Sequence, residues 1–316
     1  MSDVLAQGSR GIAGGTGRPQ VAFQGEPGAF SEEAVLSFFA DPEPVSVSTW
    51  RAVFEAVRDG VTEAGVVAIE SSLAGTIRET YDLLGEFDLE IVGAVSVPVR
   101  LALLALPGES LERIERVYSH AQALVQADEF LRTRPWQIMT TYNTAGAARM
   151  IAEAGERHAA AVASPRVAEL YGLTVIAADI QTGDANRTRF VVLSRPNAGH
   201  HWAPAATQGQ PMMTTLVFAV RNVPGALHRC LGVFAERGLN LSRLESRPSR
   251  AARWEYVFWV DLDAAVDAPE AAAALDDLRR EAAMVRILGS YPRPPEDSPS
   301  LALQRSGACR RDSVRR

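Results

Sequence analysis

The sequence predicts an α/β protein in two parts, and three observations support this. Up to about residue 195, short apolar runs alternate with segments of helical periodicity, which is typical of a largely parallel sheet covered by helices. A stretch rich in Pro, Gly, Ala and Gln follows at 196–211 and indicates a linker. The remaining elements are ordered βαββαβ, which predicts a small ferredoxin-like unit. The 316 residues are enough for two domains of about 150 residues each.

The first part contains several apolar runs that predict strands. They lie at residues 20–24, 65–69, 89–92, 97–106, 116–118, 136–142 and 159–163. Helices are expected between them. One begins near Ser31, and a second places Trp50, Val53, Phe54 and Val57 on one face before ending at Gly60.

Polar residues stand at or just after the carboxyl ends of five predicted strands. They are Gln24, Glu70, Ser119, Asn143 and Ser164. Ligands of open α/β sheets bind at this edge, so their convergence predicts a binding site there. The alternative is that some of them only cap helices. Ser119 and Gln122 form an S-x-x-Q capping box for a helix through residue 131, and Ser164 precedes Pro165 as N-cap and first helical residue.

The second part begins with a strand at 214–221. A helix follows from the turn at 223–227, with Leu227, Leu231 and Phe234 on one face, and Gly238 ends it. Strands are predicted at 239–247 and 254–263, a helix at 269–284 and a last strand at 285–288.

The composition excludes several classes of function. The net charge of −6 gives the chain no basic footprint for nucleic acid. All 32 basic residues are arginine, which excludes a Schiff-base lysine or a P-loop lysine. The two cysteines predict neither a disulfide nor a metal site. No signal peptide and no apolar run of membrane-spanning length is present, so we expect a soluble, cytoplasmic protein without a cofactor.

The stretch Asn186-Arg187-Thr188-Arg189-Phe190 is the strongest candidate for chemistry. It places a carboxamide, a hydroxyl and two guanidiniums at the mouth of an apolar run that predicts a strand. Such groups donate hydrogen bonds to a small anion, and Arg189 can bind a carboxylate in a bidentate fork. The alternative is an edge-strand threonine with two solvated arginines.

Thr188-Arg189-Phe190, with Asn186 before it, resembles the signature of the prephenate dehydratase family. A second motif, Leu244 to Pro248, resembles the effector motif of that family's regulatory ACT domain. The resemblance extends over residues 25–34, 69–84, 118–131, 144–148 and 163–190. It implies a two-lobed catalytic domain like a periplasmic binding protein at 19–195, a linker at 196–212 and an ACT domain at 213–293. The segments 1–18 and 294–316 are expected to be disordered tails.

The resemblance also implies a reaction, in which prephenate loses CO2 and its ring hydroxyl together to give phenylpyruvate. No metal or cofactor is needed for it. The implied catalytic residues are Thr188, Arg189 and Phe190, with Thr188 donating a hydrogen bond to the departing oxygen. The implied substrate-binding residues are Asn186, Glu70, Ser71, Ser72, Ser119, Gln122, Asn143 and Thr144. The chain departs from the family pattern at Ser71, Ala94, Leu101, Ala121 and Thr182.

By the same resemblance, the second part binds L-phenylalanine as an effector and pairs across subunits in a homodimer or homotetramer. The implied effector-binding residues are Gly225, Ala226, Leu227, Glu245, Ser246, Arg247 and Pro248. The alternatives are an arogenate dehydratase, a prephenate decarboxylase that does not aromatise the ring, and a non-catalytic small-molecule sensor, because fold does not fix function.

Overall fold

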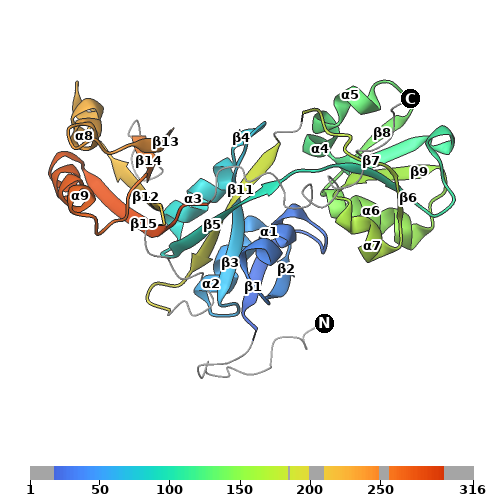
Figure 1. Ribbon diagram of the computed structural model, residues 1–316, viewed down its shortest axis with the longest axis horizontal. Helices are drawn as coiled ribbons and strands as arrows, with labels where there is room; N and C mark the ends of the chain where they lie inside the picture. The colour runs from blue at the N-terminus through green and yellow to red at the C-terminus, as the bar shows by residue number, and fades with distance from the viewer. Residues whose placement is uncertain (1–17, 184–185, 199–209, 249–255, 295–316) are drawn as a thin grey trace, which may run out of the picture.

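The structure is a computed structural model, and it describes residues 18–183, 186–198, 210–248 and 256–294. Three sheets with their own helices lie in a row, with lobe 1 in the middle, lobe 2 on one side and a C-terminal domain on the other (Figure 1). The predicted tails and most of the predicted linker lie outside the described residues. No helix among the described residues is long and apolar enough to span a membrane.

Lobe 1 is built on a mixed sheet in the order β2-β1-β3-β11-β5, and β4 pairs with β3. Its strands are β1 (Gln20–Gln24), β2 (Glu43–Val47), β3 (Ala64–Ser71), β4 (Gly75–Thr76), β5 (Glu90–Pro98) and β11 (Arg187–Ser194). β1 pairs parallel with β2 and β3, but β11 pairs antiparallel with β3 and β5. The expectation of a largely parallel sheet is wrong for this half, because β11 returns from lobe 2 and enters in the opposite direction.

Helices cover both faces of this sheet. They are α1 (Phe30–Phe38), α2 (Trp50–Arg58) and α3 (Arg78–Glu86). The core under α1 includes Phe190 and Val97, whereas Val191 and Leu193 pack on the other face with α2 and α3. The periodicity of α2 is confirmed, because Val53, Phe54 and Val57 are fully buried.

A β-bulge lies where β3 and β11 approach lobe 2. Arg189 is opposite Glu70, but Phe190 is opposite Ala68, so Ile69 is the extra residue. A bulge breaks the alternation of side chains and redirects the residue that follows it. Glu70 therefore shares the face of Arg189, and Ser71 shares the opposite face with Thr188.

Lobe 2 has the strand order β10-β6-β9-β7-β8. Its strands are β6 (Ala102–Ala105), β7 (Arg116–His120), β8 (Gln137–Thr141), β9 (Ala159–Ala163) and β10 (Thr174–Ala177), and its helices are η1 (Leu111–Arg113), α4 (Ala121–Gln126), α5 (Asp128–Leu131), α6 (Thr144–Ala154) and α7 (Arg166–Tyr171). β7 pairs parallel with β8 and β9, and β6 pairs antiparallel with β9 and β10. The predicted helix through residue 131 is interrupted at Ala127, and Pro165 rather than Ser164 is the N-cap of α7.

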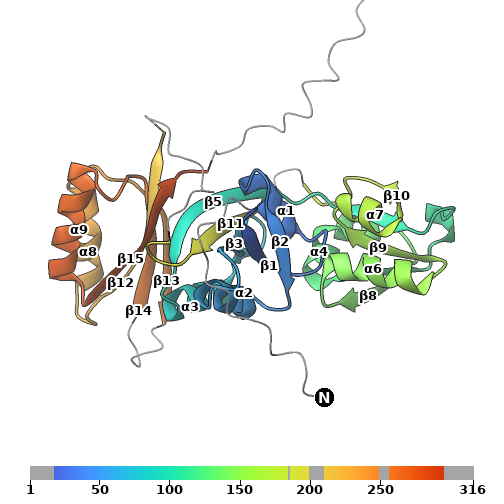
Figure 2. The same ribbon diagram turned by 90° about the horizontal axis from the view of Figure 1, so that it is seen from below.

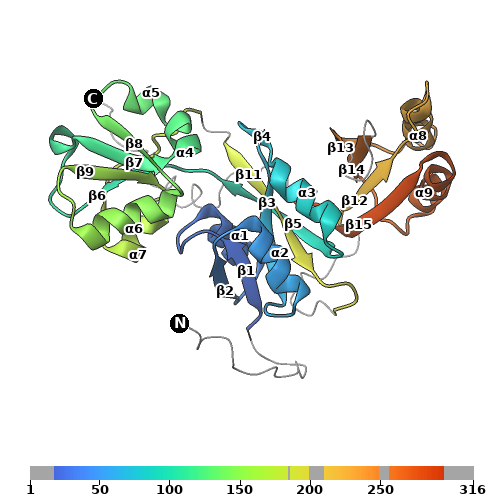
Figure 3. The same ribbon diagram turned by 180° about the vertical axis from the view of Figure 1, so that it is seen from behind.

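The C-terminal domain has the predicted βαββαβ order. It consists of β12 (Met212–Ala219), α8 (Ala226–Ala235), β13 (Leu241–Pro248), β14 (Tyr256–Leu262), α9 (Pro269–Glu281) and β15 (Met284–Pro292). The antiparallel sheet has the order β13-β14-β12-β15. Helices α8 and α9 cover its outer face, and its inner face lies against α3 and β5 of lobe 1 (Figures 2 and 3). Trp259 and Tyr291 from this face join the core of lobe 1.

Candidate active site

Two chain segments connect the lobes and form a hinge beside the predicted site. One follows β5 and the other precedes β11, and they are hydrogen-bonded to each other. Val99 N donates to Asn186 O at 2.8 Å, and Ile180 N donates to Leu101 O at 2.9 Å. The carboxyl ends of β1 and β3 and the amino end of β11 lie on the side of lobe 1 that adjoins lobe 2 (Figure 1). We use the word cleft for this boundary between the two lobes.

Thr188 lies at the hinge end of β11, opposite Ser71 on β3 and Val97 on β5. The side chain of Thr188 lies on the same face of the sheet as that of Phe190, two residues further along β11. Phe190 is 1% exposed and packs in the core under α1. Phe190 therefore supports the strand and does not line the cleft. Ser71 is buried, and its hydroxyl accepts a hydrogen bond from Ala74 N at 3.3 Å.

Asn186 is the most unusual of the predicted residues. Its side chain is 2% exposed, and neither the oxygen nor the nitrogen of its amide has a hydrogen-bond partner among the described residues. A buried amide without partners is rare in folded proteins, because its desolvation is then uncompensated. The backbone of the next residue, Arg187, is held by two hydrogen bonds to Ser72. Arg187 N donates to Ser72 Oγ at 2.9 Å, and Ser72 N donates to Arg187 O at 2.9 Å. The amide of Asn186 is thus a buried polar group at the hinge without a partner among the described residues.

Arg189 and Glu70 are not brought together with Thr188. Arg189 forms an ion pair with Asp261 of the C-terminal domain at 3.0 Å, and Glu70 forms one with Arg243 at 3.2 Å. Arg189 faces away from Thr188 because side chains alternate along β11, and the bulge at Ile69 turns Glu70 to the face of Arg189. Burial lowers the pKa of the Arg189 guanidinium, but nearby acidic groups, Asp261 first, more than offset this, so the pKa is raised and Arg189 stays charged.

The residues predicted on lobe 2 have different surroundings. Ser119 does not cap a helix, because it is buried in β7 and its hydroxyl donates to Val162 O at 2.6 Å. The N-cap of α4 is His120, whose Nδ1 accepts from Gln122 N at 3.3 Å. The side chain of Asn143 caps α6 as predicted by accepting from Gly146 N. Gln122 is exposed and Thr144 is the first residue of α6.

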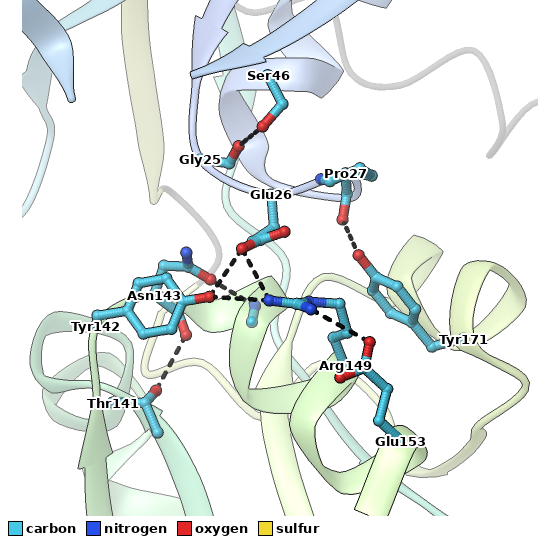
Figure 4. Close-up of polar contacts among 11 residues, drawn as sticks. Gly25, Glu26, Pro27, Ser46, Thr141, Tyr142, Asn143, Arg149, Glu153 and Tyr171 are labelled. Atoms are coloured by element: carbon cyan, nitrogen blue, oxygen red, sulfur yellow. Dashed lines mark hydrogen bonds and ion pairs between the residues drawn. The ribbon is translucent and has the colours of Figure 1, made fainter. Parts of the chain in front are cut away.

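A polar cluster that the sequence did not single out crosses the cleft (Figure 4). Glu26, in the loop after β1, accepts hydrogen bonds from Tyr142 Oη at 2.8 Å and from Arg149 Nη2 at 3.1 Å. Nearby, Tyr171 Oη donates to Pro27 O at 3.0 Å. These contacts hold the loop of lobe 1 to α6 and α7 of lobe 2. Hydrogen bonds with Tyr142 and Glu153, together with Glu26, raise the pKa of Arg149.

Among the described residues, no three His, Cys, Asp or Glu side chains are grouped so as to hold a metal ion. Neutral hydroxyl and amide side chains instead stand at this boundary, at Thr188 and Asn186 on the side of lobe 1 and at Asn143, the N-cap of α6, on the side of lobe 2. A helix N-terminus has free N–H groups and favours anions. Of the five positions at which the chain departs from the family pattern, Ala94 and Leu101 are buried core residues, Ala121 is the first residue of α4, and Thr182 N donates to Gln126 O at 2.6 Å.

Comparison with known proteins identifies the family. The model of the family "Prephenate dehydratase" matches residues 21–198, which include both lobes, and the model of the ACT domain matches residues 214–280. The chain belongs to the prephenate dehydratase family. This is a family of dehydratases, that is, of carbon–oxygen lyases, here followed by an ACT domain.

Individual proteins similar to this chain can be aligned with it over most of its length. An arogenate dehydratase/prephenate dehydratase of Arabidopsis thaliana is 36% identical over 88% of this chain and 73% of its own length. The crystal structure of an Arthrobacter aurescens prephenate dehydratase in complex with L-Phe is 31% identical, with a TM-score of 0.77, over 89% of this chain and 93% of that one. A structure described as a novel type of quorum-quenching acylase is 36% identical, with a TM-score of 0.79, over 87% and 98%.

The two predicted effector motifs of the ACT domain are not fully brought together. The first lies at the start of α8, and the residues of the second alternate between the two faces of the sheet. Gly225 has a φ of +79° as the N-cap of α8, a conformation that favours glycine, and Ala226 and Leu227 begin the helix. These three residues line a cavity with Phe258, and Ser246 is opposite Phe258 on the neighbouring strand.

Glu245 and Arg247 instead face lobe 1. Thr76 Oγ1 donates to Glu245 at 3.1 Å, and Arg247 forms an ion pair with Asp82 at 2.9 Å. Side chains alternate along a strand, so Ser246 and Pro248 are on the other face and are exposed. Within a single chain, only part of the predicted effector site is therefore assembled beside α8.

Proposed function

We propose that the chain converts prephenate into phenylpyruvate, CO2 and water in phenylalanine biosynthesis. The family match over residues 21–198 carries this proposal. The placement of Thr188 and of the unpartnered Asn186 amide at the hinge supports it. Arogenate is the second candidate substrate, because the Arabidopsis relative is named for both reactions.

The chemistry requires recognition of carboxylates and assistance to the departing hydroxyl. The hydroxyl of Thr188 would donate a hydrogen bond to that oxygen, and such a donor is typically worth about 2.7–4 kcal/mol of transition-state stabilisation. Asn186, which has buried donor and acceptor atoms, would orient the substrate beside it. The N–H groups at the start of α6, with Asn143 and Thr144, would receive a carboxylate.

Arg189 would act differently from the expectation of direct carboxylate binding. Its guanidinium is held by Asp261 behind the strand, and 19% of its side chain is exposed. We therefore propose that Arg189 contributes by fixing β11, because its charge is compensated by Asp261. Glu70 would likewise act through its strand, because it is bound to Arg243.

The ACT domain would bind L-phenylalanine and regulate the reaction. The Arthrobacter relative, whose structure contains L-Phe, supports this. Strand β13, which carries part of the effector motif, is an edge strand with Leu244 46% exposed. An exposed edge strand is a surface on which another chain pairs. We accordingly propose a homodimer or homotetramer with ACT domains adjacent, and a cytoplasmic location.

The test is phenylpyruvate formation by the purified protein from prephenate, with Thr188→Ala and Thr188→Ser measured in parallel. Loss of the donor in Thr188→Ala should lower kcat about 100- to 1,000-fold. Thr188→Ser keeps the hydroxyl and is the matched control, which should retain most of the activity. Equal activity of wild type and Thr188→Ala would show that the Thr188 hydroxyl has no role in the reaction.

Other products would redirect the proposal. Phenylalanine formed from arogenate, without turnover of prephenate, would identify an arogenate dehydratase. Loss of prephenate without phenylpyruvate would identify a decarboxylase. Hydrolysis of an N-acyl amide alone would place the chain with the acylase, and prephenate binding without any turnover would indicate a sensor.

A further inference from the structure

A buried polar cluster joins lobe 1 to the ACT domain directly behind the candidate site. We call it the junction cluster. It comprises Glu70 and Arg189 from lobe 1 and Thr215, Arg243, Asp261 and Tyr291 from the ACT domain. Neither the reaction nor effector binding, as proposed above, accounts for its four ACT residues.

One half of the junction cluster is centred on Asp261. This residue is 3% exposed and pairs with Arg189 through Oδ2 at 3.0 Å. Its other oxygen, Oδ1, accepts from Thr215 Oγ1 at 2.7 Å, and this hydroxyl lies 2.7 Å from Tyr291 Oη. Burial and Asp261 raise the pKa of Tyr291 to about 12, so its hydroxyl stays protonated. The carboxylate that holds Arg189 is thus itself held in place.

The other half is centred on Arg243. Its side chain is 10% exposed, it pairs with Glu70 at 3.2 Å, and its guanidinium lies 5.0 Å from the centre of the Tyr81 ring. Tyr81 in turn packs edge-on against Trp259 of the ACT sheet at 5.1 Å. The charged group is therefore enclosed between α3 and the ACT domain. Because 39% of the Glu70 side chain is exposed, only the guanidinium of Arg243 is enclosed, and removing Glu70 would leave this charge without its partner.

The register of the sheet connects this cluster to the site. Glu70 and Arg189 are opposite each other on β3 and β11, and Ser71 and Thr188 are the next pair toward the hinge. The two pairs point to opposite faces because side chains alternate along a strand, and the bulge at Ile69 makes Glu70 the partner of Arg189. Any shift of Asp261 or Arg243 therefore acts on the two strand ends that carry Ser71 and Thr188.

We propose that Asp261 and Arg243 of the ACT sheet are positioning residues for the reaction. They hold Arg189 and Glu70 from behind and so set the place of the Thr188 hydroxyl in the cleft. The ACT domain then regulates the enzyme by displacing these two groups. The dehydratase reaction and its control by phenylalanine are those of the proposed function, on which this inference rests.

The decisive variant is Asp261→Asn, which keeps the shape of the side chain and removes its charge. A misplacement of about 1 Å at a catalytic group lowers the rate on the order of 100-fold, so kcat should fall 10- to 100-fold, with KM changing less. Phenylalanine should bind the variant with a Kd within about twofold of the wild-type value, but should no longer change kcat. Glu281→Gln, which breaks the exposed pair with Arg229 inside the ACT domain, is the matched control and should behave as wild type.

Hydrogen exchange provides a readout that needs no substrate. Amides of residues 187–191 should exchange faster in Asp261→Asn than in wild type, while those of β9 in lobe 2 stay unchanged. A double-mutant cycle of Glu70→Gln and Arg243→Gln should be strongly non-additive in kcat.

The inference is overturned if Asp261→Asn is folded and keeps kcat, phenylalanine response and exchange of β11 within twofold of wild type. It is also overturned if exchange rises uniformly throughout the chain, which would indicate a purely structural role. If wild type turns over neither prephenate nor arogenate, the proposed function fails instead, and the exchange experiment alone decides whether Asp261 holds β11.

Discussion

Gly289 lies where the backbones of the ACT domain and lobe 1 approach closely, and its replacement by alanine tests this junction. A Cβ built on Gly289 would lie 1.9 Å from the carbonyl oxygen of Ile91 and 2.8 Å from its carbonyl carbon. Both atoms belong to the backbone of β5, so no rotamer change relieves the contact. To reach the 3.0 Å below which Cβ contacts essentially do not occur, β15 must move away from β5 by at least about 1.1 Å.

We expect Gly289→Ala to destabilise the protein by about 1–3 kcal/mol, the usual cost of inserting a methyl group into a well-packed interface. The displacement should also loosen the contacts of Tyr291 and Asp261, so phenylalanine should inhibit the variant less. Guanidinium unfolding followed by circular dichroism measures the first effect. Hydrogen exchange of β5 and β15 amides locates it.

Gly232→Ala is the matched control in the same domain. It lies inside α8, and the nearest atom to a built Cβ is 3.9 Å away. Alanine in a helix interior is more favourable than glycine by about 0.5–1 kcal/mol, so this variant should be stabilised. The reasoning is refuted if Gly289→Ala unfolds at the same denaturant concentration as wild type, or if both variants shift in the same direction.

Three further predictions concern the lobes. Glu26→Gln should raise KM for prephenate several-fold by loosening the contact with Arg149, with a stability change of at most about 1 kcal/mol in chemical unfolding. An unchanged KM would show that this contact does not contribute to substrate binding. Burial raises the pKa of Glu33 above its ordinary value of 4.5, so folding favours the protonated form of its carboxyl group. Glu33→Gln should therefore raise Tm near pH 8, and this gain should disappear below pH 4.5. A gain in Tm that does not depend on pH would contradict the prediction. Thr49→Ala should cost about 0.5–2 kcal/mol in denaturant unfolding, because Thr49 caps α2, whereas Thr49→Ser should be nearly neutral.

Local patterns predicted most of the elements, and the errors have a common cause. The strand predicted at 20–24 and the βαββαβ order agree with the structure. The run at 97–106 was predicted as one strand, but it is divided between β5 and β6 because the chain crosses there from lobe 1 to lobe 2. Ser119 fits a capping pattern, yet its hydroxyl bonds to Val162, 43 residues away. Tertiary contacts decided these cases, and no local pattern encodes them.

The candidate site was predictable in position but not in orientation. Thr188 and Asn186 lie at the hinge end of a strand, as their place before an apolar run indicates. Arg189 faces the ACT domain because it alternates with Thr188 along β11, which the strand pattern implies, whereas Glu70 joins it through a bulge at Ile69 that has no sequence signature here. Glu26 stands in a recognisable turn, but its partner Arg149 is 123 residues away, so the contact across the cleft required the structure.

The place of β11 in the sheet has a consequence for how the chain acquires its structure during synthesis. All strands of lobe 2 lie between residues 102 and 177, so this lobe has its full set of partners before β11 has been made. Lobe 1 begins earlier, but β3 and β5 are joined only by β11, which starts at Arg187. Until then, β3 is paired only on the side of β1 and β4, and β5 has no partner in this sheet. Open strand edges of this kind are prone to association with other chains. The lobe that is synthesised first is therefore the one that is completed last, and it is the lobe on which the ACT domain then docks.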